Sequence, residues 1–204
     1  NQSLKRMNLD YVDIFYSHRY DPVTPLEETL QTLVDIVRQG KALYVGISKY
    51  PKEAAEFAYK YLAERDVHCL LYQGKYNLFN REPEEEGILR QAKENGTGFI
   101  AFSPLAQGLL TNRYLNGIPE DSRMARGGFL KKEQLTEDVL SKIKALNKMA
   151  EERGQTLAEM ALAWVLKDDL VTSVIIGASS VAQLEDNLKA IRNTSFTKEE
   201  LRRL

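Results

Sequence analysis

The side chains best placed for chemistry follow short apolar runs of the sequence. The first run, at 11–17, is rich in Val, Ile and Tyr and is followed at once by His18. Such a run is typical of a buried strand in a parallel sheet, so it delivers an imidazole to the carboxyl edge of that sheet. That edge is where α/β barrels carry out their chemistry. An imidazole held there can donate a hydrogen bond to charge that develops on a reacting oxygen.

A second candidate site, for an anion, lies near the other end of the sequence. The apolar segment 172–176 runs into Gly177-Ala178-Ser179-Ser180, and a helix is predicted over 181–191. This order turns backbone N–H groups and the positive end of the helix dipole toward a bound anion. Gln183 and Asn187 are one helical turn apart and share a face, so both could contact one ligand.

Strand-then-helix units must position these residues. Five apolar segments are predicted as strands, at 11–17, 42–47, 69–73, 98–102 and 172–176. Helical periodicity at 24–38, 51–65 and 84–94 separates the first four, and this alternation is typical of a parallel sheet. We expect Thr24 to cap the first of these helices, with Pro25 at its first position, and Asn95-Gly96 to end the third.

The interval 103–171 interrupts this alternation. It begins with a long loop that contains several glycines and continues with helices predicted at 136–153 and 156–167. Thr156 and Glu159 have the spacing of a capping box, and another helix is predicted to begin near Thr197. A loop of this length in a compact domain usually has a function, often as a flap over a ligand.

Composition limits the class of protein. The 204 residues, 43% hydrophobic and 28% charged, are enough for one domain with a core of its own. A formal net charge of -1 gives no general attraction to nucleic acid or to an anionic membrane. No segment is apolar over the length that spans a bilayer, and the first residues lack the apolar core of a signal peptide. The single cysteine, Cys69, is predicted to be a small buried hydrophobe, and we expect a reducing, cytoplasmic location.

Motifs at the predicted strand ends occur in a recognisable order. They are Asp-Ile-Phe-Tyr-Ser-His-Arg at 13–19, Val-Gly-Ile-Ser-Lys-Tyr at 45–50, Gln73 with Tyr76-Asn77, Phe-Ser-Pro-Leu-Ala-Gln-Gly-Leu-Leu at 102–110, and Ile-Gly-Ala-Ser-Ser-Val-Ala-Gln-Leu-Glu-Asp-Asn at 176–187. Together they cover nearly the whole chain, which resembles the aldo-keto reductase superfamily. The resemblance is greatest to the branch that contains bacterial glyceraldehyde 3-phosphate reductases and potassium channel β subunits.

The resemblance implies a (β/α)8 TIM barrel, an α/β fold. A closed barrel of this kind typically needs about 250 residues, and only five of its eight strand-helix units are legible here. We therefore expect residues 1–204 to form a single partial barrel domain, with no second domain and with three strands missing before Asn1.

The family's chemistry implies one catalytic residue in this chain. In aldo-keto reductases an aspartate, a tyrosine, a lysine and a histidine surround the substrate carbonyl, and His18 matches the histidine. The other three come from the first three strand ends of the family, which no part of this sequence matches. The resemblance thus implies an NADPH-dependent reductase of small aldehydes or ketones that needs no metal, and a fragment that is inactive alone.

The resemblance also implies a binding path for NADP(H). Ser48, Lys49 and Gln73 would meet the nicotinamide carboxamide, although Lys49 replaces the more frequent asparagine, and Tyr76 would lie near the stacked ring. The pyrophosphate would lie along Ser103, Pro104, Leu105, Gln107 and Gly108, with Arg113 and Arg123 closing over the dinucleotide. At the adenosine end the matching residues are Gly177, Ser179, Gln183, Asp186 and Asn187, with Ser179 facing the 2′-phosphate.

Two other functions fit the same residues. The first is an NADPH-binding sensor similar to the channel β subunits, in which slow chemistry serves as a signal; His18 favours an active reductase over it. The second is a non-catalytic partial barrel whose open sheet edge must be covered by another chain or by its own missing segment. The sequence leaves the carbonyl substrate and the number of subunits open, a homo-oligomer included.

Overall fold

The computed structural model describes residues 1–120, 122, 124–125, 127 and 130–204. Arg123, which was predicted to close over the dinucleotide, lies outside the described residues. The described residues group into two compact units. The first contains 1–75, 82–100 and 170–172, and the second contains 76–81, 101–169 and 173–204.

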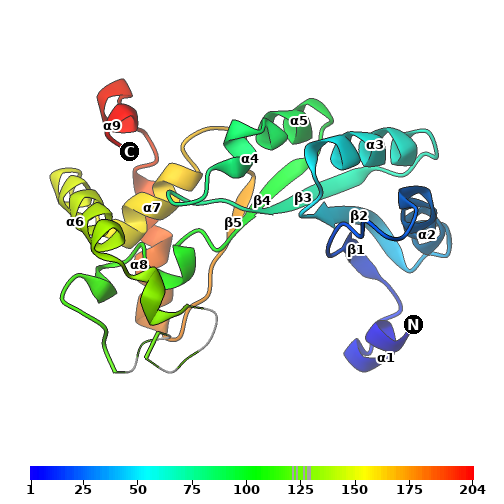
Figure 1. Ribbon diagram of the computed structural model, residues 1–204. Coiled ribbons are helices and arrows are strands. Elements are labelled where there is room, and N and C mark those ends of the chain that lie inside the picture. Colours follow the sequence, from blue (N-terminus) through cyan, green and yellow to red (C-terminus); the bar gives the residue numbers. More distant parts are fainter. Residues whose placement is uncertain (121, 123, 126, 128–129) are drawn as a thin grey trace. The chain divides into compact units, whose positions relative to one another are not determined.

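Five strands form one sheet in chain order, β1-β2-β3-β4-β5 (Figure 1). Their bounds are Val12–Ser17, Ala42–Ser48, Cys69–Lys75, Gly98–Phe102 and Ser173–Ile175. β2 pairs in parallel with both β1 and β3, and its pairing with β3 contains a register shift between Val45 and Gly46. All five predicted strands are confirmed, each bound within two residues. The prediction succeeds because short apolar runs bounded by turn residues are a local signal.

The helices of the first unit are α1 (Gln2–Met7), α2 (Leu26–Arg38), α3 (Lys52–Ala63), α4 (Glu82–Glu85) and α5 (Ile88–Glu94). α2 packs against β1, β2 and α3, and α3 packs against β3 (Figure 1). The buried stripe of α2 contains Leu30, Leu33 and Val34, which are spaced at the helical period. α2, α3 and the pair α4–α5 lie in the crossover connections between successive strands, whereas α1 precedes β1.

Two of the expected helix details are wrong. Thr24 does not cap α2, because its Oγ1 donates to Asp21 Oδ2 at 2.7 Å and Pro25 takes the N-cap position instead. The helix predicted over 84–94 is divided into α4 and α5 at Gly87, whose φ of 79° is left-handed and cannot continue a right-handed helix. The predicted end of the third helix is confirmed, since Gly96 has a φ of 67° and terminates α5.

The second unit contains α6 (Glu137–Glu152), α7 (Leu157–Val165), α8 (Val181–Leu188) and α9 (Lys198–Arg203). α7 is buried along its whole length and packs against both α6 and α8. The capping box predicted for α7 is confirmed, because Thr156 and Glu159 exchange hydrogen bonds of 3.0 and 3.2 Å. Short 3-10 turns follow at 106–108, 112–114, 132–134 and 189–192. None of the helices within the described ranges combines the length and hydropathy needed to cross a membrane.

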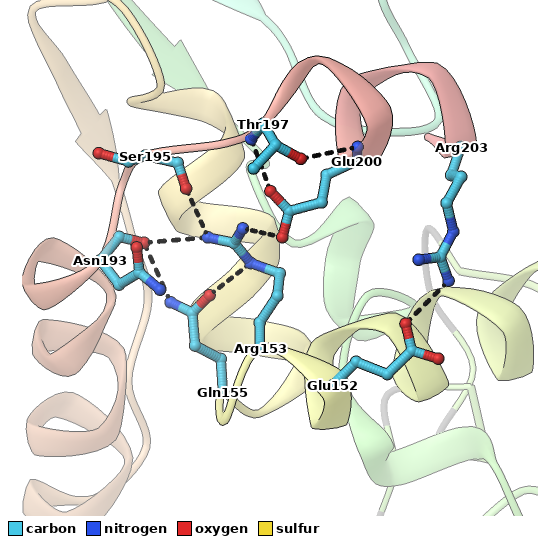
Figure 2. A network of polar contacts seen from close by, with 8 residues as sticks. All are labelled: Glu152, Arg153, Gln155, Asn193, Ser195, Thr197, Glu200 and Arg203. Carbon is cyan, nitrogen blue, oxygen red and sulfur yellow. Dashed lines mark hydrogen bonds and ion pairs between the residues drawn. The ribbon is translucent and has the colours of Figure 1, made fainter.

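A buried arginine ties the segment after α8 to the turn between α6 and α7 (Figure 2). Arg153 Nη1 lies 2.6 Å from Glu200 Oε1, and the two side chains are only 5% and 20% exposed. The same guanidinium donates to Gln155 Oε1 at 2.9 Å and to the Ser195 carbonyl oxygen at 2.9 Å, and it stacks over the Phe196 ring at 3.8 Å. Both terminal nitrogens of the Arg153 guanidinium therefore donate hydrogen bonds to residues in the segment 193–200.

Removing this charge should destabilise the second unit. Replacing Arg153 with Met leaves the Glu200 carboxylate half-buried without its partner, so we expect a loss of about 3 kcal/mol in the free energy of unfolding. Urea denaturation measures it. Arg203→Met is the matched control, because its ion pair with Glu152 is 47% and 45% exposed and should be worth less than about 1 kcal/mol. Equal losses in the two variants would contradict the stabilising role of the buried Arg153–Glu200 ion pair.

The close packing of β1 against β2 depends on a glycine in β2. A Cβ added at Gly46 would lie 2.5 Å from Tyr16 Cε1 and 3.1 Å from the Leu71 carbonyl oxygen. Because side chains of neighbouring strands lie side by side, the ring of Tyr16 can cover β2 only where β2 carries no side chain. Gly46 therefore allows β1 and β2 to pack tightly just before their carboxyl ends.

Gly46→Ala should force the Tyr16 ring out of place and cost about 1–3 kcal/mol of stability, as overpacking does. Thermal or urea unfolding measures the loss. Tyr16→Leu removes the ring atoms that clash, so the double variant should lose less than the sum of the two single variants. Additive losses would show that the ring does not limit residue 46.

Candidate active site

Three predicted site residues lie at the carboxyl edge of β1, β2 and β3. Ser17, the last residue of β1, pairs with Ile47, and Ser48, the last residue of β2, pairs with Gln73 in β3. His18 directly follows β1 and is exposed. The parallel register thus places His18, Ser48 and Gln73 along one edge of the sheet. Their role in binding stays a prediction.

Two of the predicted cofactor residues carry buried polar atoms that lack a partner. Ser48 is 2% exposed and Asn187 is 5% exposed, and neither Ser48 Oγ nor Asn187 Nδ2 has a hydrogen-bond partner among the described residues. An unsatisfied buried polar atom costs free energy, so such atoms in native proteins usually have a role. A hydroxyl suits a carboxamide, and an amide N–H₂ suits a ring nitrogen or oxygen of adenosine. Each atom is therefore a candidate ligand contact within its own unit.

Left-handed backbone at residues other than glycine occurs in two of the predicted segments, and also elsewhere, at Asn8 and Asp66. Lys49 has a φ of 55°, Ser103 of 54°, Ala106 of 46° and Gln107 of 61°. The Lys49 N–H donates to the Gln73 carbonyl oxygen at 3.3 Å, which holds this conformation against β3. Such conformations cost about 1–3 kcal/mol each and are concentrated at functional sites. The segment after β2 and the segment after β4 each stay a predicted place of ligand contact.

The segment predicted to follow the pyrophosphate is a tight turn after β4. The Ala106 N–H donates to the Ser103 carbonyl oxygen at 2.9 Å, and the Gly108 N–H donates to Leu105 at 2.8 Å. These two amides are therefore used inside the turn, and the path of the pyrophosphate along 103–108 stays a prediction. Asn77 Nδ2 donates to the Ser103 carbonyl oxygen at 2.9 Å and fixes the start of the turn, which also contains Pro104. Further along the loop, Arg113 lies in the 3-10 turn Asn112–Tyr114.

The residues predicted for the adenosine end lie in the turn before α8 and on α8. Ser179 lies two residues after Gly177. Its backbone N–H (2.7 Å) and its hydroxyl (3.0 Å) both donate to Gln183 Oε1. Gln183 therefore satisfies the donors that were predicted to face the 2′-phosphate, and its side chain must turn away before an anion can take them. Asp186 pairs with Lys189 at 2.6 Å, and this hydrogen bond raises the pKa of Lys189 above its ordinary value.

Tyr76 is not available to stack on a nicotinamide ring, so that prediction is wrong. Its side chain is fully buried, with its ring centroid 5.0 Å from that of Trp164. Its hydroxyl accepts from Lys167 Nζ at 2.8 Å. Although Tyr and Lys are a catalytic pair in aldo-keto reductases, this pair is enclosed in helix packing, where no substrate can reach it.

Tyr50 is the last residue of the motif at 45–50, but no role was predicted for it. It is 2% exposed, its hydroxyl lies 2.9 Å from Ser17 Oγ, and its carbonyl oxygen accepts from the Tyr72 hydroxyl at 2.7 Å. Burial raises the pKa of Tyr50, so its hydroxyl stays protonated in neutral solution. Tyr50 thus bonds to both strands that flank β2.

Cys69 is a buried thiol, as predicted. It is 3% exposed, and burial raises its pKa to about 12, so it is a thiol and not a thiolate at neutral pH. In the part of the chain that the structure describes, no three His, Cys, Asp or Glu side chains gather as metal ligands would.

The profile of the aldo/keto reductase family matches residues 1–204. The chain belongs to that family. Among curated proteins, this family member is 54% identical over 205 residues to the L-glyceraldehyde 3-phosphate reductases of Escherichia coli strains K12 and O157:H7, with 98% of the chain covered. It is 39% identical over 193 residues to a probable voltage-gated potassium channel subunit beta of Arabidopsis thaliana, with 93% covered.

The solved structures agree on the fold of this aldo/keto reductase family member. The crystal structure of a thermostable aldo-keto reductase in complex with the inhibitor epalrestat matches 98% of the chain with a TM-score of 0.72 and 30% identity. The α/β sheet described above is therefore part of a (β/α)8 barrel. The chain spans 59% of the length of the curated relatives and 61% of that crystallised chain.

Ser48→Ala tests the unpartnered hydroxyl in the whole protein. Because Ser48 Oγ makes no hydrogen bond to the described residues, its removal should leave thermal stability unchanged or slightly higher. The NADPH dissociation constant, measured by fluorescence titration, should rise by about three- to tenfold, the value of one hydrogen bond.

Thr97→Val is the matched contrast, because Thr97 Oγ1 donates to the Cys69 carbonyl oxygen at 2.7 Å in a buried site. It should lower stability by about 1 kcal/mol and leave NADPH affinity unchanged. A Ser48→Ala protein that loses stability but keeps its affinity would show that the hydroxyl is structural.

Proposed function

We propose that the whole protein containing this chain reduces small aldehydes or ketones with NADPH. The observation that supports the proposal is the parallel register, in which Ser17, the residue before His18, pairs with Ile47, and Ser48 pairs with Gln73. Membership of the aldo/keto reductase family supports it. The relatives named L-glyceraldehyde 3-phosphate reductase make a short phosphorylated aldehyde the first substrate to test.

The residues of this chain divide the proposed work. Ser48 and Gln73 hold the carboxamide, and the segments 103–108 and 177–187 hold the pyrophosphate and the adenosine. NADPH, when bound, supplies the hydride. His18 Nδ1 or Nε2 donates a hydrogen bond to the substrate carbonyl oxygen, which gains negative charge as the carbonyl carbon is reduced. By resemblance to the family, the proton comes from a tyrosine that this sequence does not contain, so we expect the 204-residue chain alone to be inactive.

Several sequence predictions stay proposals beside this function. They are the preference for NADP(H) over NAD(H), the cytoplasmic location, the single partial barrel domain, and the absence of nucleic-acid and membrane partners. The preference for NADP(H) rests on the family, since 177–187 contains no Arg or Lys that could pair with a 2′-phosphate.

An NADPH-binding sensor is the second candidate. The 39% and 38% identity to probable potassium channel β subunits of Arabidopsis thaliana and Oryza sativa favours it. The experiment measures NADPH consumption by the whole protein with L-glyceraldehyde 3-phosphate and with methylglyoxal. Turnover supports the reductase, whereas tight NADPH binding without turnover supports the sensor.

His18→Ala separates the catalytic step from cofactor binding. We expect kcat for the aldehyde to fall about 10²-fold, because a group that acts on the reacting oxygen is lost. The NADPH dissociation constant should change less than about twofold, since His18 is assigned to the substrate and not to the cofactor.

His68→Ala is the control, because the other histidine of the chain is exposed and precedes β3, away from the carboxyl edge. It should match the wild type in both measurements. Equal losses of turnover and of NADPH affinity in His18→Ala would refute the assigned role.

A further inference from the structure

Tyr50 connects three adjacent strands near the carboxyl ends of β1 and β2. Its hydroxyl is hydrogen-bonded with Ser17 Oγ, at the end of β1, over 2.9 Å. Its carbonyl oxygen accepts from the Tyr72 hydroxyl of β3 over 2.7 Å. Tyr50 itself follows β2 by two residues. One side chain and one carbonyl group therefore join the end of β1 and the middle of β3 to the segment that follows β2.

The joined segment contains the proposed nicotinamide contacts. Ser48, with its buried hydroxyl that lacks a partner among the described residues, and Lys49, with a φ of 55°, directly precede Tyr50. A left-handed residue other than glycine persists only where its surroundings hold it. The bonds of Tyr50 on one side and the bond from the Lys49 N–H to Gln73 on the other supply that restraint.

The other partner of Tyr50 directly precedes the proposed catalytic histidine. Ser17 is the last residue of β1 and His18 is the next. The hydroxyl bond between Tyr50 and Ser17 thus links the backbone that carries His18 to the backbone that carries Ser48. The Tyr50 end of this bond is buried, because the Tyr50 side chain is only 2% exposed. The ring of Tyr50 also packs edge-to-face against the ring of Tyr20, with the two centroids 5.5 Å apart.

We propose that Tyr50 is a positioning residue, whose bond to Ser17 sets the distance between the substrate carbonyl at His18 and the nicotinamide at Ser48. The inference rests on the proposed reductase function. Hydride transfer needs the two reacting atoms in near-attack geometry, and small displacements lower the rate steeply. Tyr50 itself touches neither substrate nor cofactor.

The structure offers a closely matched control. Tyr59, in α3 of the same unit, is also buried, at 5% exposed, but its hydroxyl has no partner among the described residues. Tyr50→Phe removes a hydroxyl that joins two strand ends, whereas Tyr59→Phe removes one that joins nothing described. Ser17→Ala removes the same bond as Tyr50→Phe from its other side, and Ser17→Thr keeps a hydroxyl there.

The experiment measures three quantities in the whole protein: kcat for a small aldehyde, the NADPH dissociation constant, and the dissociation constant of adenosine 2′,5′-bisphosphate. The bisphosphate probes the adenosine end alone. In Tyr50→Phe we expect kcat to fall at least about tenfold and NADPH binding to weaken about threefold, with bisphosphate binding changed less than about twofold. Ser17→Ala should match it, Ser17→Thr should recover most of the activity, and the double variant should lose no more than either single variant.

Three results would overturn the inference while the proposed function stands. They are a Tyr50→Phe protein that behaves like Tyr59→Phe, a loss of bisphosphate affinity as large as the loss of turnover, and additive losses in the double variant. If Tyr50→Phe does not fold, Ser17→Ala with Ser17→Thr decides the same question. A wild-type protein that neither binds NADPH nor reduces an aldehyde would refute the proposed function, and the inference with it.

Discussion

The parallel hydrogen-bond register of β1, β2 and β3 is the constraint on which the candidate site depends. Parallel strands end at one edge of a sheet, so side chains far apart in the sequence become neighbours there. Ser48 lies beside Gln73 because β2 and β3 pair in this register. A slip of one residue would turn these side chains to the opposite face. Burial of the α2 stripe around Leu30 and Val34 against the sheet keeps the register in place.

The first unit has unfavourable local features where it is proposed to bind. Ser48 Oγ is buried without a partner among the described residues, and Lys49 is left-handed, as are Asn8 and Asp66 outside the proposed site. The second unit has the same features at Asn187 and at the turn that begins at Ser103. Natural proteins break local rules mainly at functional sites. Unpartnered buried atoms and left-handed backbone thus occur at positions that the family motifs also identify, and also at Tyr59 and Asp66, which no motif includes.

Features set by local sequence were predictable. The strands follow apolar runs, and the Thr156-Glu159 capping box follows a spacing rule, so both are confirmed. Features set by neighbours were not. Gly87 was hidden inside a helical pattern, and Thr24 found a competing acceptor in Asp21. Tyr76 is enclosed by Trp164, which lies far away in the sequence.

The site shows the same division. Motif order named its residues, yet it could not show that Gln183 holds the donors of Ser179 or that Tyr50 joins three strands. Both facts depend on side-chain conformations, which no pattern of residue types specifies. The tyrosine, lysine and aspartate expected from the family have no matching segments in this sequence, so no reasoning from it could place them.

Cys69 gives the sheet a built-in reporter. It is the only cysteine of the chain, it begins β3, and its thiol is both covered and protonated at neutral pH. A thiol reagent can react with it only when β3 separates from its neighbours, because the reaction needs an exposed thiolate. The rate at which a thiol reagent labels this one sulfur atom thus reports how often β3 separates from β2 and β4, and no cysteine has to be introduced for the measurement.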